Sequence, residues 1–184
     1  METTNFKIVS SKSNVEWTGR KVTGAHNGII SIKEGNFTLN DGKIKEGNVI
    51  INTSTIKILD VTDPATNAQF ASHLASDDFF SIEKFPIASF DILNIREVSD
   101  STYYLEGNLT IKDITHLVGF EATVENNRDT ITLSGKLVID RTKYDIRFRS
   151  GNFFKDLGDT LIYNDFELDF NITAEAILSE QSKN

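Results

Sequence analysis

The stretch Phe166-Glu-Leu168-Asp-Phe170-Asn-Ile172-Thr-Ala174 decides the fold, because every second side chain along it is apolar. A period of two is typical of a β-strand with one face buried and the other in water. The same alternation recurs at Ile131–Ile139 and at Tyr103–Ile111. Weaker matches cover Val15–Gly19, Gly28–Ile32, Asn36–Asn40, Lys43–Asn52, Ala88–Ile95 and Val118–Glu125. So many strands, separated by turn signals such as Asn40-Asp41-Gly42, predict an antiparallel meander.

One segment breaks this pattern and predicts a helix. Pro64–Ala75 carries a stripe of small apolar residues, with Asp63 as a suitable N-cap and Pro64 at the first helical position. Glycines inside two of the strong strands, Gly107 and Gly135, are typical of the bends that a barrel needs. The sequence therefore predicts an all-β fold, a barrel of about eight strands closed to remove its edges, with one short inserted helix. We expect one domain over residues 1–178 and a polar tail over Ser179–Asn184.

A barrel of this size either fills its interior with side chains or holds one ligand. The segment His73–Pro86 bears on this choice, because it places three phenylalanines at the junction between the predicted helix and the next strand, where they could close a core or the mouth of a cavity. We expect the following residues to line a ligand site: Trp17, Phe37, Phe79, Phe80, Phe85, Phe90, Leu105, Leu109, Phe120, Leu133, Leu137, Phe148, Phe166 and Phe170.

The composition excludes several classes of function. The 184 residues contain thirteen phenylalanines and no cysteine, which rules out disulfides and cysteine-ligated metal sites. A net charge of −8 argues against a nucleic-acid surface. No run of residues approaches the roughly 18 apolar residues of a membrane helix. The first residues resemble no secretion signal, so we expect a cytoplasmic protein, or a periplasmic one if a signal has been removed.

Catalytic and metal-binding motifs are weak. His26, His73 and His116 lie far apart in the sequence, and Asp77-Asp78 lacks the alternating ligands and closing Glu of a calcium loop. There is no Gly-x-Ser-x-Gly elbow and no glycine-rich phosphate loop. We therefore predict no catalytic residue, no metal and no cofactor.

A local excess of positive charge occurs at Arg141–Arg149. One interpretation is an anion clamp at a pocket mouth, formed by Arg141, Lys143 and Arg147, since guanidinium groups match phosphate oxygens. The other, which is the more common case, is a solvated β-strand whose arginines pair with Asp156, Asp159 or Asp165.

Several motifs, in this order, resemble the YceI-like family over about Phe6–Ala176. They are Val15-Glu-Trp17-Thr-Gly19, Gly24-Ala-His26-Asn-Gly28, His73-Leu-Ala-Ser-Asp-Asp-Phe-Phe80, Gly107-Asn-Leu109-Thr-Ile111-Lys112, Ile139-Asp-Arg141-Thr-Lys143-Tyr144 and Asp165-Phe-Glu167-Leu168. The resemblance implies an extended, lipocalin-like antiparallel barrel, a long apolar tunnel for a polyisoprenoid or other long-chain amphiphile, and no enzyme activity. The chain departs from the family pattern at Phe70-Ala71-Ser72, where the family often has Arg-Asp, and at Lys112-Asp113, where it usually has Lys-Gly.

The leading hypothesis is thus a carrier or storage protein for a polyisoprenoid, an isoprenoid quinone or a similar lipid. A small hydrolase or isomerase that uses a buried Asp140 or Asp91 is an alternative. A ligand-free stress-response or interaction module is another, and it requires a filled interior. Whether the protein forms a homodimer stays open.

Overall fold

The computed structural model describes residues 2–177. The predicted tail, Ser179–Asn184, and the outermost residues of the predicted domain, 1 and 178, lie outside the described residues. The strands are β1 (Thr3–Ile8), β2 (Asn14–Lys21), β3 (Gly24–Asn40), β4 (Lys43–Ile58), β5 (Ile87–Glu97), β6 (Thr102–Ile111), β7 (Ile114–Asn127), β8 (Thr130–Asp140) and β9 (Ile162–Ala176). The helices are α1 (Pro64–Ala75) and the short 3-10 helices η1 (Ser10–Lys12), η2 (Arg141–Tyr144) and η3 (Gly158–Thr160).

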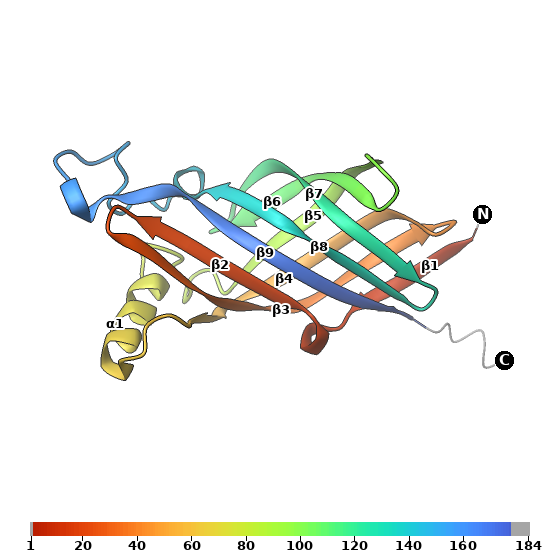
Figure 1. The fold of residues 1–184 in the computed structure, drawn as a ribbon, viewed down its shortest axis with the longest axis horizontal. Coiled ribbons are helices and arrows are strands. Elements are labelled where there is room, and N and C mark those ends of the chain that lie inside the picture. Colours follow the sequence, from red (N-terminus) through yellow and green to blue (C-terminus); the bar gives the residue numbers. More distant parts are fainter. Residues whose placement is uncertain (1, 178–184) are drawn as a thin grey trace.

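These strands form one antiparallel sheet that closes on itself. The order is β1-β3-β2-β9-β8-β7-β6-β5-β4, and the further pairing of β3 with β4 joins the two ends. β1 and β2 occupy successive stretches of the same position: Phe6 of β1 and Val15 of β2 both lie between β3 and β9. Nine strand segments therefore fill eight positions, which confirms the predicted extended barrel with one inserted helix (Figure 1).

The structure corrects two details of the strand prediction. Gly28–Ile32 and Asn36–Asn40 are not separate strands but parts of the long β3, which bends through register shifts against β4 at Ile29/Ser31 and Ile32/Glu34. Register shifts of this kind let a strand curve around a barrel without breaking. β1 was not predicted, although its alternation places Phe6 and Ile8 in the core.

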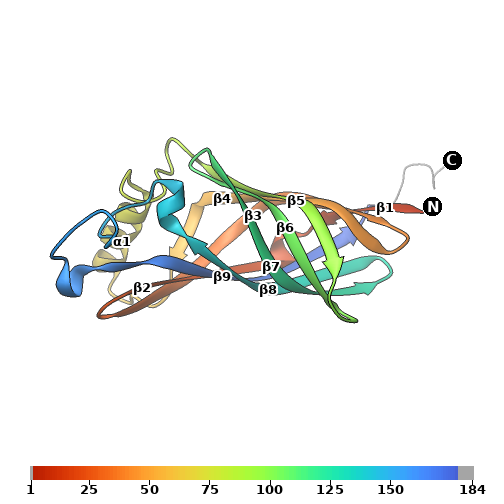
Figure 2. The same ribbon diagram turned by 90° about the horizontal axis from the view of Figure 1, so that it is seen from above.

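Helix α1 has the bounds that the sequence predicts. The Asp63 carboxylate accepts hydrogen bonds from the Thr66 amide at 2.9 Å and from its hydroxyl at 2.6 Å, and Pro64 opens the helix. These hydrogen bonds lower the pKa of Asp63. The helix lies across one end of the barrel, and the start of β1 and the end of β9 lie at the other (Figures 1 and 2). In the part of the chain that the structure describes, no helix is both long and apolar enough to cross a membrane.

Alternating side chains of the strands point into the barrel and form two cores. The terminal core, at the end of the barrel where β1 begins and β9 ends, includes Phe6, Phe37, Leu105, Ile131 and Ala174, each at most 2% exposed. The helix-end core lies beneath α1 and includes Trp17, Leu74, Phe79, Ile139 and Tyr144.

Candidate functional site

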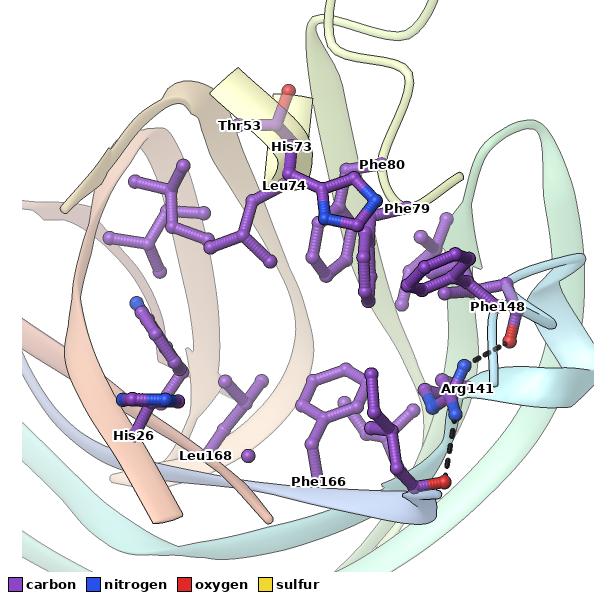
Figure 3. Close-up of a pocket in the computed structure, with 18 of the residues that line it drawn as sticks. His26, Thr53, His73, Leu74, Phe79, Phe80, Arg141, Phe148, Phe166 and Leu168 are labelled. Atoms are coloured by element: carbon purple, nitrogen blue, oxygen red, sulfur yellow. Dashed lines mark hydrogen bonds between the residues drawn. The ribbon is translucent and has the colours of Figure 1, made fainter. Parts of the chain in front are cut away.

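An apolar cavity of about 470 Å³ opens at the helix end of the barrel. Its walls come from inward positions of several strands, among them Trp17 of β2, Leu109 of β6 and Leu168 of β9. Figure 3 shows Phe166 and Leu168 along one wall and the side chains of α1 opposite them. The volume lies within the range of ~300–1,000 Å³ that is usual for small-molecule sites. The interior is thus partly open, and its lining can bury an apolar ligand.

Helix α1 and the turn after it cover this cavity. Leu74 points inward from α1, and Phe79 and Phe80 follow from the turn (Figure 3). The turn is held locally, because the Phe80 amide donates to the Leu74 carbonyl at 3.1 Å and the Ser81 hydroxyl donates to Asp77 at 2.5 Å. The aromatic junction therefore lies at the cavity, as one of the two sequence interpretations expects.

Edge-to-face ring contacts connect this cover to the barrel. The centroid of Phe79 lies 5.6 Å from that of Phe148, in the segment after η2, and Phe80 lies 6.3 Å from Phe166 of β9. The imidazole of His73 contacts both Phe79 at 4.9 Å and Phe148 at 4.6 Å. Such contacts are directional but weak, worth about 0.5–1.5 kcal/mol each beyond the buried area.

Trp17 is positioned by one hydrogen bond and one glycine. Its indole N–H donates to the Lys57 carbonyl at 3.1 Å. A side chain at Gly28 on the neighbouring strand would place its Cβ 2.7 Å from the indole ring. The ring therefore occupies space beside a strand that has no side chain there, and its polar atom is satisfied.

The histidines at the cavity each pair with an aspartate. His26 Nδ1 lies 2.8 Å from Asp60 Oδ2 and its ring contacts Phe70 of α1 at 4.7 Å, whereas His73 Nε2 lies 3.0 Å from Asp78 Oδ2. Burial alone would raise the pKa of Asp60, but the hydrogen bonds from the Asn27 amide and from His26 lower it overall. Both histidines line the cavity (Figure 3).

The three histidines do not converge. His116 lies apart from the other two against η2, with Nε2 2.9 Å from the Lys143 carbonyl oxygen. Residues 2–177 hold no group of three or more His, Cys, Asp or Glu side chains arranged to bind a metal ion.

Arg141 is buried at the cavity wall and is held by backbone carbonyls. Its Nε donates to the Tyr163 carbonyl at 3.0 Å, Nη1 to that of Ile146 at 2.8 Å and Nη2 to that of Ile162 at 3.0 Å. Burial lowers the pKa of Arg141, and the negative charge of Asp140 opposes this shift. The guanidinium group thus ties the segment after β8 to the start of β9 (Figure 3).

The interpretation of this basic segment as a solvated strand is wrong. Residues 141–144 form the 3-10 helix η2, capped by Asp140, and the ion pair of Arg147 is with Asp145 at 3.3 Å rather than with the acids predicted. Lys143 and Arg147 are exposed and do not line the cavity, whereas Arg149 does, with its guanidinium group stacked on Phe148 at 4.9 Å.

A family model of the YceI-like domain matches residues 6–174. The chain belongs to the YceI-like family. Two curated relatives, each called a UPF0312 protein and from two strains of Pseudomonas putida, are 34% identical over 59 residues. This match covers 32% of the chain and 31% of each relative, so the chain matches only about a third of their length.

Solved structures of similar fold agree with this assignment. BcnA of Burkholderia cenocepacia has a TM-score of 0.69 at 21% identity, over 90% of this chain and 98% of that one. A polyisoprenoid-binding domain from Saccharophagus degradans has a TM-score of 0.69 at 11% identity, over 94% and 98%. A YceI protein of Campylobacter jejuni has a TM-score of 0.57 at 17% identity, over 75% of each chain. At these identities the likeness shows the shared fold.

Six of the fourteen residues expected to bind ligand line the cavity of this YceI-like barrel: Trp17, Phe79, Phe80, Leu109, Phe148 and Phe166. The other eight do not line it. Phe90, Phe120 and Phe170 pack below its inner end, Leu137 lies in the helix-end core, Phe85 is half-buried beside Thr53, and Phe37, Leu105 and Leu133 lie in the terminal core. Ligand contact by any of these residues stays a prediction.

Other lining residues of the YceI-like barrel were missed by the sequence interpretation. Leu168 and Ile111 belong to the alternating strands already recognised, so the signal for them was present. Arg20, Lys21 and Arg149 line the mouth, but they lie at strand ends and in a loop, where no alternation marks an inward face.

The carboxylates of the enzyme hypothesis lie away from the cavity lining. The Asp140 carboxylate accepts hydrogen bonds from the Thr142 amide at 3.0 Å and from its hydroxyl at 2.6 Å, and so caps η2. Asp91 is exposed on β5. In this YceI-like chain the Asp140 side chain therefore has a structural position, and the Asp91 side chain has a solvated one.

Proposed function

We propose that this YceI-like protein binds the apolar tail of an isoprenoid or similar long-chain lipid in the cavity beneath α1, as a carrier or storage protein and without catalysis. The single observation that carries the proposal is the cavity itself, about 470 Å³ in volume with an apolar wall of aromatic and branched side chains. A ligand-free module would have a filled interior. The Saccharophagus degradans domain of similar fold is a polyisoprenoid-binding domain.

The tail is expected to provide most of the affinity. Burying ~500 Å² of apolar surface gains about 12 kcal/mol at ~25 cal/mol/Å², against association costs of about 4–15 kcal/mol. The rings beside the tail need no hydrogen-bond partner from it, which suits branched isoprene units.

The head group is expected at the mouth, near Lys21 and Arg149. Both side chains line the cavity and carry positive charge. Arg20 also lies there, but its guanidinium group pairs with Glu167 at 2.7 Å. Arg141, Lys143 and Arg147 were the sequence-based candidates, and three donors of Arg141 already bind carbonyl oxygens.

The direct test is native mass spectrometry of the protein purified from its own source. We expect a co-purified lipid, and after delipidation we expect uptake of farnesol and of farnesyl phosphate. A delipidated protein that takes up neither compound would refute the proposal.

A second comparison tests the head-group site. Lys21→Ala together with Arg149→Ala should weaken the binding of farnesyl phosphate about tenfold, which is the value of roughly one charge-assisted hydrogen bond. The affinity for farnesol should stay unchanged. The matched control is Arg147→Ala, which removes a nearby exposed cation outside the cavity. An equal loss for both ligands would mean that the pair acts on the structure rather than on the head group.

A further inference from the structure

The inward side chains of β9 change their role along the strand. Phe166 and Leu168 line the cavity, whereas Ile172 and Ala174 belong to the terminal core and are 6% and 0% exposed. Phe170 lies between the two groups. The opening inside the barrel therefore ends at the level of Phe170, about halfway along this strand.

Three rings from alternate strands lie together at that level. The ring centroid of Phe120 on β7 is 5.3 Å from that of Phe90 on β5 and 5.4 Å from that of Phe170 on β9. On the strands that flank these three rings, Val15 of β2 pairs with Phe170, and Val49 of β4 pairs with Phe90. Both valines are at most 8% exposed. We call Phe90, Phe120 and Phe170 the ring layer.

Glycines on the two strands between them leave space for the ring layer. A Cβ at Gly107 of β6 would lie 2.6 Å from Phe90 Cζ, and a Cβ at Gly135 of β8 would lie 3.0 Å from Phe170 Cζ. Phenylalanine and glycine thus alternate across five neighbouring strands. Large rings fit side by side in the barrel because the intervening strands have no side chain there.

The depth of the cavity follows from strand geometry. From Ile162 at the mouth to Phe170 the strand advances by eight residues (170 − 162), roughly 26 Å at ~3.3 Å per residue, or about 20 Å along the axis at a strand tilt of ~35–45°. A carbon–carbon bond of ~1.5 Å advances a zigzag chain by roughly 1.3 Å, so this depth holds about 15 bonds. This length is close to that of the main chain of geranylgeraniol and far shorter than that of solanesol.

We infer that the ring layer is the floor of the site and sets the length of tail that the protein accepts. The ligand class is then an isoprenoid of about geranylgeranyl length rather than a long polyprenyl chain. This inference rests on the proposed function and narrows it. It also differs from the long tunnel that the family resemblance implies, because the terminal core occupies the rest of the barrel.

The test is to measure the affinity of delipidated protein for geraniol, farnesol, geranylgeraniol and solanesol. For the wild type, affinity should rise with length up to geranylgeraniol and gain nothing further with solanesol. In Phe120→Ala and Phe170→Ala the floor is opened, so the affinity for solanesol should rise by roughly tenfold, as expected when about two more methylene groups are buried. Ile172→Ala is the matched control, because it also truncates an inward side chain of β9 but lies below the ring layer. It should leave the length preference unchanged.

A variant that fills the site tests the inference without opening the core. Ala88 of β5 lines the cavity one inward position above Phe90. Ala88→Phe should shorten the tail that the site accepts, so that geranylgeraniol binds no better than farnesol. If Phe120→Ala and Phe170→Ala do not fold, this variant tests the inference by itself. If Ala88→Phe and the truncated variants that fold keep the length preference of the wild type, the ring layer is not the floor of the site. If the wild type binds none of the four alcohols, the proposed function is wrong instead.

Discussion

Arg141 shows how a charged side chain is accommodated at the wall of an apolar cavity. It is 4% exposed, and its three hydrogen bonds end on backbone carbonyl oxygens of Tyr163, Ile146 and Ile162. The planar guanidinium group can reach three acceptors in different directions, which an ammonium group on a flexible stem cannot do. The residue therefore holds the segment that carries Phe148 against the start of β9.

We expect Arg141→Ala to lower the free energy of unfolding by about 2–4 kcal/mol, because it leaves buried carbonyls without a donor. Arg141→Lys should recover only part of this loss. Urea unfolding followed by tryptophan fluorescence measures both, with the exposed Arg147→Ala as a control that should stay within about 0.5 kcal/mol of wild type. A change below 1 kcal/mol in Arg141→Ala would contradict the bracing role.

Gly107 allows a second prediction about a single residue. Gly107→Ala should destabilise the protein by about 1–3 kcal/mol, because the new methyl group would overlap the Phe90 ring and a neighbouring backbone carbonyl. Gly19→Ala is the matched control, since nothing lies within 4 Å of a Cβ at that strand position. Thermal unfolding of the two variants compares them directly. Equal midpoints would show that the space above Gly107 is not needed.

At the scale of elements, α1 is joined to the barrel through side chains, and of its residues only Leu74 is buried. Ring contacts of His26 with Phe70 and of Phe148 with His73 connect it to β3 and to the loop after η2, and Asn67 donates to the carbonyl of Ile58 at the end of β4 at 3.0 Å. The helix is also capped at its start by Asp63. An element with so little burial is expected to open locally before the barrel unfolds, which would admit a ligand.

Asp63→Ala should therefore speed amide hydrogen exchange in α1 severalfold at neutral pH without changing exchange in β7 and β8. The folded pKa of Asp63 lies below its ordinary value of 3.8, so the stabilisation by its charge is complete above that value and is lost as the pH falls through the folded pKa. The difference between wild type and Asp63→Ala should narrow in that acidic range. Asp63→Ser, which keeps a capping oxygen without charge, should exchange close to wild type. Uniform acceleration over the whole chain would contradict local opening.

At the scale of the whole molecule, closure of the sheet determines where a cavity can exist. Every strand has two neighbours in the barrel, so the sheet closes into a wall around an interior that stays open at one end. The terminal core provides the complementary packed half. The packed core and the open cavity therefore coexist because they occupy different stretches along the axis of the same barrel.

Ligand binding should raise the stability of the whole barrel by mass action. At about one hundred times its dissociation constant, geranylgeraniol should add about 2.7 kcal/mol, which corresponds to a rise of roughly 5–10 °C in the melting temperature of a chain of this size. Differential scanning fluorimetry at several ligand concentrations measures the shift. Ile172→Ala, whose cavity-lining residues are intact, should show the same increment, and a shift that does not depend on concentration would contradict specific binding.

Local signals in the sequence were sufficient for most elements. Alternation identified the main strands, and the Asp63-Pro64 pair set the start of α1 at the residue observed. β1 was missed because it is short and lies at the chain end, although Phe6 and Ile8 alternate. The basic segment at Arg141 was misread because a charge pattern alone does not distinguish a strand from a turn whose donors bind carbonyl oxygens.

The sequence by itself determined that the chain forms a barrel and which side chains point inward, because strand alternation is a local property of two-residue period. Only the tertiary structure decided which inward rings line the cavity and which fill the core. Phe166 and Phe170 have the same local pattern, yet Phe166 lines the cavity whereas Phe170 does not and packs against Phe120. Their difference is one of height along the barrel axis, and that height is set by strand register, tilt and closure between segments distant in sequence.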